Sequence, residues 1–155
     1  NGIIERLTEL KINYVNITPQ YRDIPLKRRV KRANKYGTKN VFCLSVHANA
    51  GGGSGSEIFT SPGTTQSDAI ATIFGEEFLK EFPEEQLRTD YSDGDLDKEA
   101  KFTILTKTKM PAVLTENFFM DNERECKKFL MTKNGRERII RYHVNAILRL
   151  RDEWF

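Results

Sequence analysis

The stretch Val41-Phe42-Cys43-Leu44-Ser45-Val46-His47 is a nearly continuous apolar run that ends on an imidazole. Such a run is typical of a strand that is covered on both faces, as in a parallel sheet. A second apolar run, Ala112-Val113-Leu114-Thr115, follows Pro111 and ends on Glu116. Segments with helical spacing lie before, between and after these runs. The pattern therefore predicts a single α/β domain, with a mainly parallel twisted sheet and helices on both of its faces.

The other predicted elements alternate along the chain. Apolar positions at helical spacing predict helices over residues 2–10, 26–35, 67–82 and 136–148, and a short helix after Asn122. Short β-branched or aromatic runs predict further strands at residues 14–17, 56–60 and 102–105. Candidate helix caps are Asp23 and Ser67, while Asn122 with Glu125 resembles a capping box. We expect Gly135 to separate the last two helices.

Composition excludes some classes of protein. The chain has 155 residues, of which 38% are hydrophobic and 30% charged, and this fits one globular domain. No apolar run approaches the ~20 residues that span a bilayer. Two cysteines do not make a disulfide framework, and Cys43 is expected to be a small buried thiol.

The net charge of +3 is distributed unevenly, because residues 41–100 hold three Lys or Arg against twelve Asp or Glu. A uniform basic face for nucleic acid is therefore not expected. The acidic segment 89–99 hints at a calcium loop through Asp93, Asp95 and Asp97. However, Lys98 stands where such a loop needs glycine, and no bidentate glutamate follows at the right distance. We interpret this segment as a solvated loop at the rim of a substrate site.

One polar side chain follows each of the two main predicted strands, at the point where the strand ends. In open α/β sheets, functional groups collect beyond the carboxyl ends of the strands, so His47 and Glu116 could share a cleft if their strands are parallel neighbours. An imidazole is a natural zinc ligand, and a nearby carboxylate can accept a proton from an activated water. From these two residues alone, a structural histidine and a solvated glutamate remain alternatives.

The surrounding sequence resembles the zinc-dependent N-acetylmuramoyl-L-alanine amidases. Ser45-Val46-His47-Ala48-Asn49-Ala50, followed by a glycine-rich loop and Ser56-Glu57-Ile58-Phe59, is similar to the histidine strand and the next strand of that family. Residues 111–122, PAVLTENFFMDN, resemble its P-A-V-L-x-E-x-x-F-x-x-N segment, and residues 29–34, RVKRAN, its R-x-x-x-A-N helix. The motifs occur in family order.

The resemblance implies hydrolysis of the amide bond between N-acetylmuramic acid and L-alanine in peptidoglycan. It implies a Zn²⁺ cofactor with His47 as a ligand and Glu116 as the catalytic carboxylate. Asn49 and Glu57 are candidates for holding a ligand in place or contacting substrate, although Asn49 could stabilise its loop and Glu57 could be an exposed strand carboxylate. The expected partner is peptidoglycan or a muropeptide, not nucleic acid. The expected location is the cell envelope, periplasmic or secreted, as for an autolysin or a phage endolysin.

The sequence also departs from the family pattern. The family takes a first histidine from a D-x-G-H-G-type loop and a glutamate from the segment that follows, and neither motif occurs in residues 1–155. We therefore expect an amidase domain over residues 1–155 that lacks its first strand, with two zinc ligands upstream of Asn1 and little activity alone. His143, in the last helix, is expected to be structural. The alternative function is a non-catalytic or degenerate cell-wall-binding module of the same fold.

Overall fold

A four-stranded open sheet lies at the centre of the computed structural model, which describes residues 2–154. Its strands are β1 (Cys43–Asn49), β4 (Ala112–Phe119), β2 (Glu57–Thr60) and β3 (Lys98–Glu99), in that spatial order. β1 runs parallel to β4 and β2 parallel to β3, whereas β2 and β4 are antiparallel. The predicted mainly parallel α/β sheet is confirmed.

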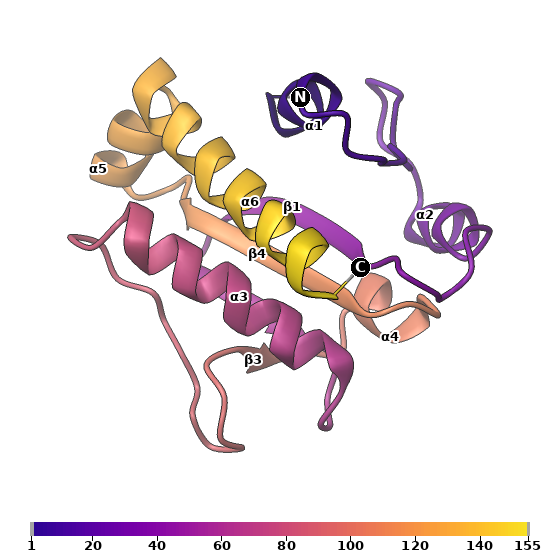
Figure 1. Cartoon of the computed structure of the whole chain (residues 1–155). Helices are drawn as coiled ribbons and strands as arrows, with labels where there is room; N and C mark the ends of the chain where they lie inside the picture. Colours follow the sequence, from indigo (N-terminus) through magenta and orange to yellow (C-terminus); the bar gives the residue numbers. More distant parts are fainter. Residues whose placement is uncertain (1, 155) are drawn as a thin grey trace.

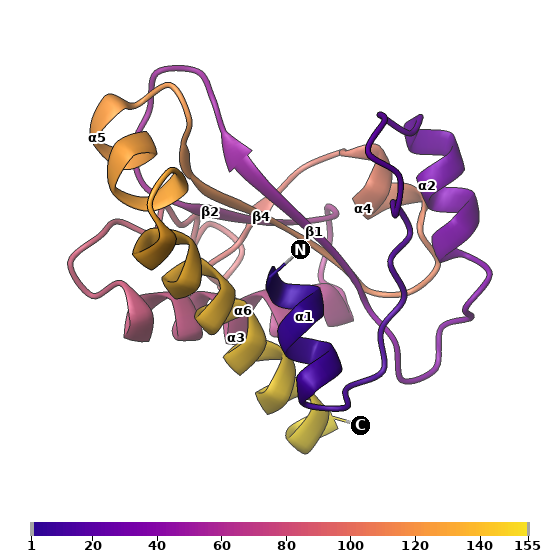
Figure 2. The same cartoon turned by 90° about the horizontal axis from the view of Figure 1, so that it is seen from above.

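Helices cover both faces of the sheet (Figures 1 and 2). One face carries α1 (Gly2–Glu9), α3 (Gln66–Glu81) and α6 (Lys133–Trp154), and the other carries α2 (Leu26–Ala33) and α4 (Thr103–Lys107). The short helix α5 (Glu123–Glu125) and a π-helical turn, η1 (Cys126–Leu130), lead from β4 into α6. None of the helices in residues 2–154 combines the length and the apolar character needed to cross a bilayer.

The first part of β4 is apolar because it is buried on both faces. Val113 packs into the larger cluster, under α3 and α6, with Phe74 and Phe78 among its members. Its neighbours Ala112 and Leu114 belong instead to the smaller cluster under α2 and α4. Alternate side chains of a strand point to opposite faces, so a segment covered on both faces, as Ala112–Leu114 is, favours apolar residues at successive positions. This explains why the apolar run before Glu116 correctly predicted a strand.

Two of the predicted strands are wrong. Residues 14–17 form no strand, and Tyr14 and Val15 are largely exposed. Residues 103–105 begin the helix α4, which Phe102 precedes as the N-cap, and Ile104 and Leu105 are both buried in the smaller cluster. A run of four apolar or β-branched residues is compatible with either a strand or a buried helical turn, and the packing partner decides between them.

Several predicted helix ends also differ. Thr65, not Ser67, caps α3, with Asp68 completing the capping box, while the Ser67 hydroxyl accepts a hydrogen bond from the backbone N–H of Ala112 at 3.1 Å. Gly135 lies inside α6 instead of before it. A Cβ at Gly135 would lie 2.3 Å from the Cα of Phe129, so only glycine allows η1 to fold back against the first turn of α6.

Asp23 caps no helix either, because its carboxylate pairs with Arg29 at 2.5 Å and Pro25 precedes the first residue of α2. At the start of α5, Asn122 Oδ1 accepts a hydrogen bond from the N–H of Glu125 at 3.2 Å. The Glu125 carboxylate, however, bonds elsewhere, so the predicted capping box forms only in half.

His143 is fully buried between α6 and the sheet. Its Nδ1 lies 2.8 Å from the carbonyl oxygen of Ile139, which can only accept, so Nδ1 carries the proton. Its Nε2 then accepts from the hydroxyl of Thr115 at 2.9 Å. Burial lowers the pKa of His143 to about 4, which suits a neutral imidazole with both nitrogens satisfied. The structure thus gives His143 a packing role.

His143 should make the fold sensitive to acid. In the unfolded chain its pKa lies near 6.5, so between pH 6.5 and about 4 the unfolded state binds one more proton than the folded state. Stability is therefore complete above pH 6.5 and falls as the pH drops towards 4, by on the order of 3 kcal/mol in all. Urea unfolding of wild type and of His143→Gln between pH 7 and 5 measures this. Equal pH slopes in the two proteins would contradict the assignment.

Candidate active site

His47 and Glu116 face each other across neighbouring parallel strands. Their Cα atoms are register partners in the β1–β4 pair, and neighbouring strands lie about 4.8 Å apart. Glu57 on β2 is in turn the register partner of Glu116 on its other side. Because directly paired residues point to the same face, the three side chains form a row across the sheet near the carboxyl ends of β1 and β4.

A β-bulge in β4 lies immediately after Glu116. The pairing passes from His47–Glu116 to Asn49–Phe119, so β4 contains one residue more than β1 in this interval. Phe118 takes a φ of 61° there. The side-chain amide of Asn117 donates to the carbonyl oxygen of His47 at 2.8 Å and bridges the two strands. Bulges recur beside active sites because they change the direction of the side chains that follow. Here the bulge shifts the pairing of β4 with β1 directly after Glu116.

The end of the row at His47 and Glu116 borders a cavity of about 510 Å³ on the face that carries α2 and α4, the two helices that Figure 2 shows on one side of the sheet. His47 and Glu116 both line it, together with the cationic side chains of Arg29 and Lys101 and the ring of Phe102. This volume is in the range of small-molecule sites, and an apolar wall with a few convergent polar groups is their usual composition.

Glu116 is partly buried, and its Oε2 is enclosed without a hydrogen-bond partner. Burial is the main cause that raises the pKa of Glu116 to about 6, and the negative charge of Glu57 adds to it. A carboxylate with this pKa exchanges a proton readily near neutral pH. Its free oxygen leaves it able to accept that proton from a molecule in the cavity.

His47 is accessible from solvent, and its Nε2 lies 2.9 Å from the hydroxyl of Ser45. Partial desolvation of the ring, and then the charge of Arg29, lower the pKa of His47 below its usual value. The ring is therefore neutral near pH 7, which is the form that binds a metal. The accessible imidazole of His47 fits one ligand of a zinc centre, and the unpaired carboxylate oxygen of Glu116 beside it fits the acid–base group of such a centre. Catalytic zinc normally takes three protein ligands, so other groups must complete the set.

Glu57 is almost fully enclosed, at 6% exposure, so its interpretation as an exposed strand carboxylate is wrong. Its oxygens accept hydrogen bonds from Lys98 Nζ at 2.7 Å and from Asn49 Nδ2 at 2.5 Å, and Arg88 Nε lies 3.5 Å away. Asn49 therefore contacts Glu57 and, through its Oδ1, the N–H of Ala50 at 2.8 Å. These hydrogen bonds tie Asn49 to Glu57 and to its own loop.

Two carboxylates that the sequence interpretation missed hold the loop after β1. Asp121 Oδ2 accepts from the N–H groups of Gly51 and Gly52 at 2.7 and 2.8 Å, and these bonds lower the pKa of Asp121. Both glycines have positive φ, 120° and 78°, which other residues rarely adopt. Glu125 binds the N–H of Gly55 in the same loop at 2.7 Å. These partners lie about seventy positions apart in the chain, so no local pattern reveals them.

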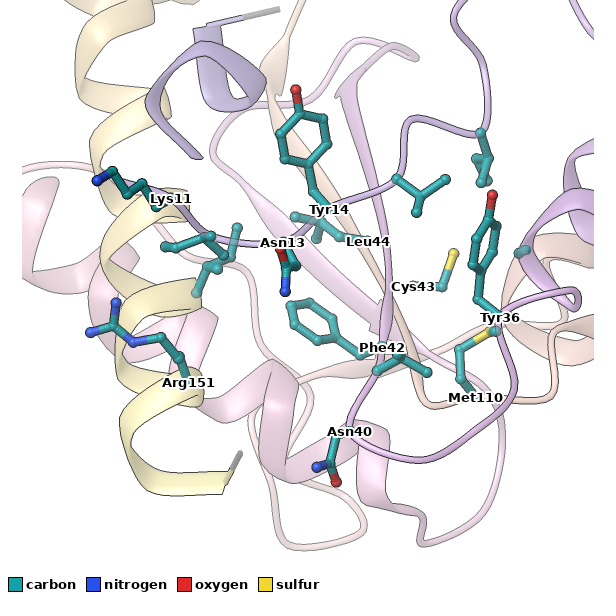
Figure 3. A pocket seen from close by; sticks show the side chains of 16 residues that line it. Lys11, Asn13, Tyr14, Tyr36, Asn40, Phe42, Cys43, Leu44, Met110 and Arg151 are labelled. Atoms are coloured by element: carbon teal, nitrogen blue, oxygen red, sulfur yellow. The ribbon is translucent and has the colours of Figure 1, made fainter. Parts of the chain in front are cut away.

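A larger cavity, of about 610 Å³, lies along the edge strand β1 and is bordered by the segment after α1 and by α6. Figure 3 shows Lys11 and Arg151 at one end of it and Tyr36 and Met110 at the other. No carboxylate or imidazole is among its lining residues within the described chain, and burial raises the pKa of Cys43 there to about 11. This cavity therefore lacks an acid–base group that works near neutral pH.

The chain is similar to known amidases. It is 36% identical over 127 residues to the N-acetylmuramoyl-L-alanine amidase CwlM of Bacillus licheniformis, which covers 81% of this chain and 46% of that protein. It is 32% identical over 126 residues to a sporulation-specific N-acetylmuramoyl-L-alanine amidase of Bacillus subtilis strain 168, covering 80% and 45%. The chain thus spans about half the length of these curated relatives.

The fold is also that of solved amidases. The catalytic domain of CwlV, an N-acetylmuramoyl-L-alanine amidase from Bacillus (Paenibacillus) polymyxa var. colistinus, superimposes with a TM-score of 0.81 at 24% identity. The match covers 97% of this chain and 79% of that one. A family profile described as N-acetylmuramoyl-L-alanine amidase matches residues 2–149. The chain therefore belongs to the N-acetylmuramoyl-L-alanine amidase family.

Proposed function

We propose that the protein hydrolyses the amide bond between N-acetylmuramic acid and L-alanine in peptidoglycan, and that this chain carries its general acid–base residue. The observation that carries the proposal is the buried, unpaired Oε2 of Glu116 beside the accessible imidazole of His47. The names of the relatives agree with this substrate. Because peptidoglycan is an envelope polymer, we also propose that the protein acts in the cell envelope or outside the cell.

An amide is a poor electrophile and its nitrogen a poor leaving group, so hydrolysis needs an activated carbonyl, a deprotonated nucleophile and a protonated nitrogen. When bound, zinc would supply Lewis-acid activation of the carbonyl and of a water, and His47 would be one of the residues that hold it. Glu116 accepts the proton of the attacking water at its free Oε2. It then delivers that proton to the departing alanine nitrogen, which is the usual order for one group serving as base and then acid.

The neighbours of this pair have separate tasks. Lys98 and Arg88 pair with the carboxylate of Glu57 and Asn49 donates a hydrogen bond to it, so these three side chains hold Glu57 beside Glu116. Lys101 and Arg29, which also pairs with Asp23, place two cationic groups in the cavity wall. The stem peptide of the substrate carries carboxylates, and we infer that these two side chains attract it to the cavity.

The full-length protein, given purified muropeptides at neutral pH, should release the stem peptide with a free amino terminus on L-alanine. A chelator should stop the release and added zinc should restore it, because the proposed reaction depends on a zinc ion that His47 helps to hold. Mass spectrometry of the products identifies the bond that is cut. Binding of muropeptide without any zinc-dependent release would overturn the proposal and favour the alternative of a non-catalytic wall-binding module.

A further inference from the structure

Three carboxylates outside the cavity of His47 and Glu116 converge on one point. Asp68 comes from the first turn of α3, and Asp95 and Asp97 come from the segment that leads into β3. One ligand oxygen from each side chain lies within 4.8 Å of the other two. Asp97 is the most enclosed of the three, at 3% exposure. The linear pattern at residues 89–99 could not reveal this group, because the third ligand lies on α3.

Two oxygens of this acidic group have no partner. Asp97 Oδ1 and Asp95 Oδ1 are buried and accept no hydrogen bond, although Asp97 Oδ2 accepts from the hydroxyl of Thr60 at 2.6 Å. None of the ion pairs among residues 2–154 includes any of the three aspartates. Buried carboxylates are normally paired or bound to a metal, because desolvating an unpaired charge is costly. The free oxygens therefore point to a missing positive partner.

We propose that Asp68, Asp95 and Asp97 form a binding site for Ca²⁺, separate from the zinc chemistry of the cavity. All three donors are carboxylate oxygens, which suit hard cations, whereas zinc sites are usually built from nitrogen and sulfur ligands. An irregular loop supplies two of the ligands. Calcium tolerates variable coordination geometry, but magnesium demands a near-ideal octahedron, so the loop favours calcium.

Calcium at this site would join the acidic segment to α3 and to the end of β2. Thr60, which donates to Asp97, is the last residue of β2, and Lys98 follows Asp97 directly. Lys98 is the register partner of Phe59 and donates to Glu57 at 2.7 Å. A cation that fixes Asp97 therefore also fixes the next residue, Lys98. Lys98 in turn holds Glu57, which lies beside Glu116 in the sheet.

The test uses full-length protein that has been freed of divalent ions with EDTA and desalted at pH 7.5. Titration with CaCl₂ in a calorimeter should show one saturable site per chain. Thermal unfolding should show a Tm that rises by about 5 °C or more at a hundredfold excess over the Kd. Asp97→Asn should abolish both responses. Asp93→Asn should keep both, because Asp93 lies exposed in the same loop and outside the cluster.

Several outcomes would overturn the calcium site. Absence of saturable binding up to several millimolar CaCl₂ would mean that the carboxylates share a proton instead. Equal calcium responses in wild type and Asp97→Asn would place the ion elsewhere, as would loss of the response in His47→Ala. MgCl₂ binding as tightly as CaCl₂ would refute the assignment to calcium. If Asp97→Asn does not fold, Asp95→Asn together with calorimetry on the wild type decides.

Discussion

Glu116→Gln should lower the rate of muropeptide hydrolysis by about 10²–10⁴-fold, which is the usual contribution of a general acid–base group. Glutamine keeps the shape of the side chain, but it cannot take up the water proton or return one to the alanine nitrogen. The effect should appear in kcat more than in KM, because the proton moves only in the transition state. The measurement is steady-state release of stem peptide by the zinc-loaded, full-length protein.

The same substitution should stabilise the metal-free protein. Burial and Glu57 raise the pKa of Glu116 from 4.5 to about 6, so its contribution to stability is greatest below pH 4.5 and is lost as the pH rises through 6. At pH 7.5 the ionised side chain is thus a cost, on the order of 1–2 kcal/mol, that glutamine removes. Urea unfolding in the presence of EDTA measures the change.

Glu123→Gln is the matched control for both effects, because Glu123 is exposed on α5 and its ion pair within residues 2–154 is with Lys127 alone. It should change neither activity nor stability by much. Hydrolysis that persists in Glu116→Gln would exclude Glu116 as the acid–base group. A loss of activity accompanied by a loss of stability would instead indicate a packing role.

The strands that carry His47 and Glu116 were predictable because they depend on short-range signals. The run that ends on Glu116 is apolar because β4 is covered on both faces, whereas β1 is an edge strand in which Val46 is exposed, so the expected double coverage of the run that ends on His47 is wrong. The prediction failed where a short apolar segment could form either a strand or a helix. Residues 103–107 became a helix because Ile104 and Leu105 share a packing site beneath α2, a fact of tertiary structure.

Charged residues were the least predictable part of the chain. The sequence placed Asp97 in a solvated loop, assigned Glu125 to a capping box and gave Asp121 no role, yet each accepts a hydrogen bond from a group far away in the sequence. The role of a carboxylate depends on the hydrogen-bond donors that the fold brings to it. The sequence positions of these donors follow no periodic pattern. The same holds for Glu57, whose partner Lys98 lies 41 positions away.

Glu125→Ala should destabilise the fold by about 3–5 kcal/mol, the usual cost of removing one partner from a buried charged network. The Glu125 side chain is fully enclosed, and its two oxygens accept from the N–H of Gly55 at 2.7 Å and of Phe119 at 2.9 Å. Alanine would leave both buried donors unpaired. Urea unfolding at pH 7.5 gives the free energy of unfolding.

A site-specific readout separates this role from a general loss of packing. Because Glu125 ties the loop after β1 to the end of β4, hydrogen exchange at the amides of Gly55 and Phe119 should accelerate first in Glu125→Ala, ahead of the core of α6. Glu125→Gln retains one acceptor oxygen and should lose protection at one of the two amides, with a smaller loss of stability. Glu123→Ala, two positions away and exposed, should change stability by less than about 0.5 kcal/mol. Uniform acceleration across the whole chain in Glu125→Ala would mean that the carboxylate holds no particular loop.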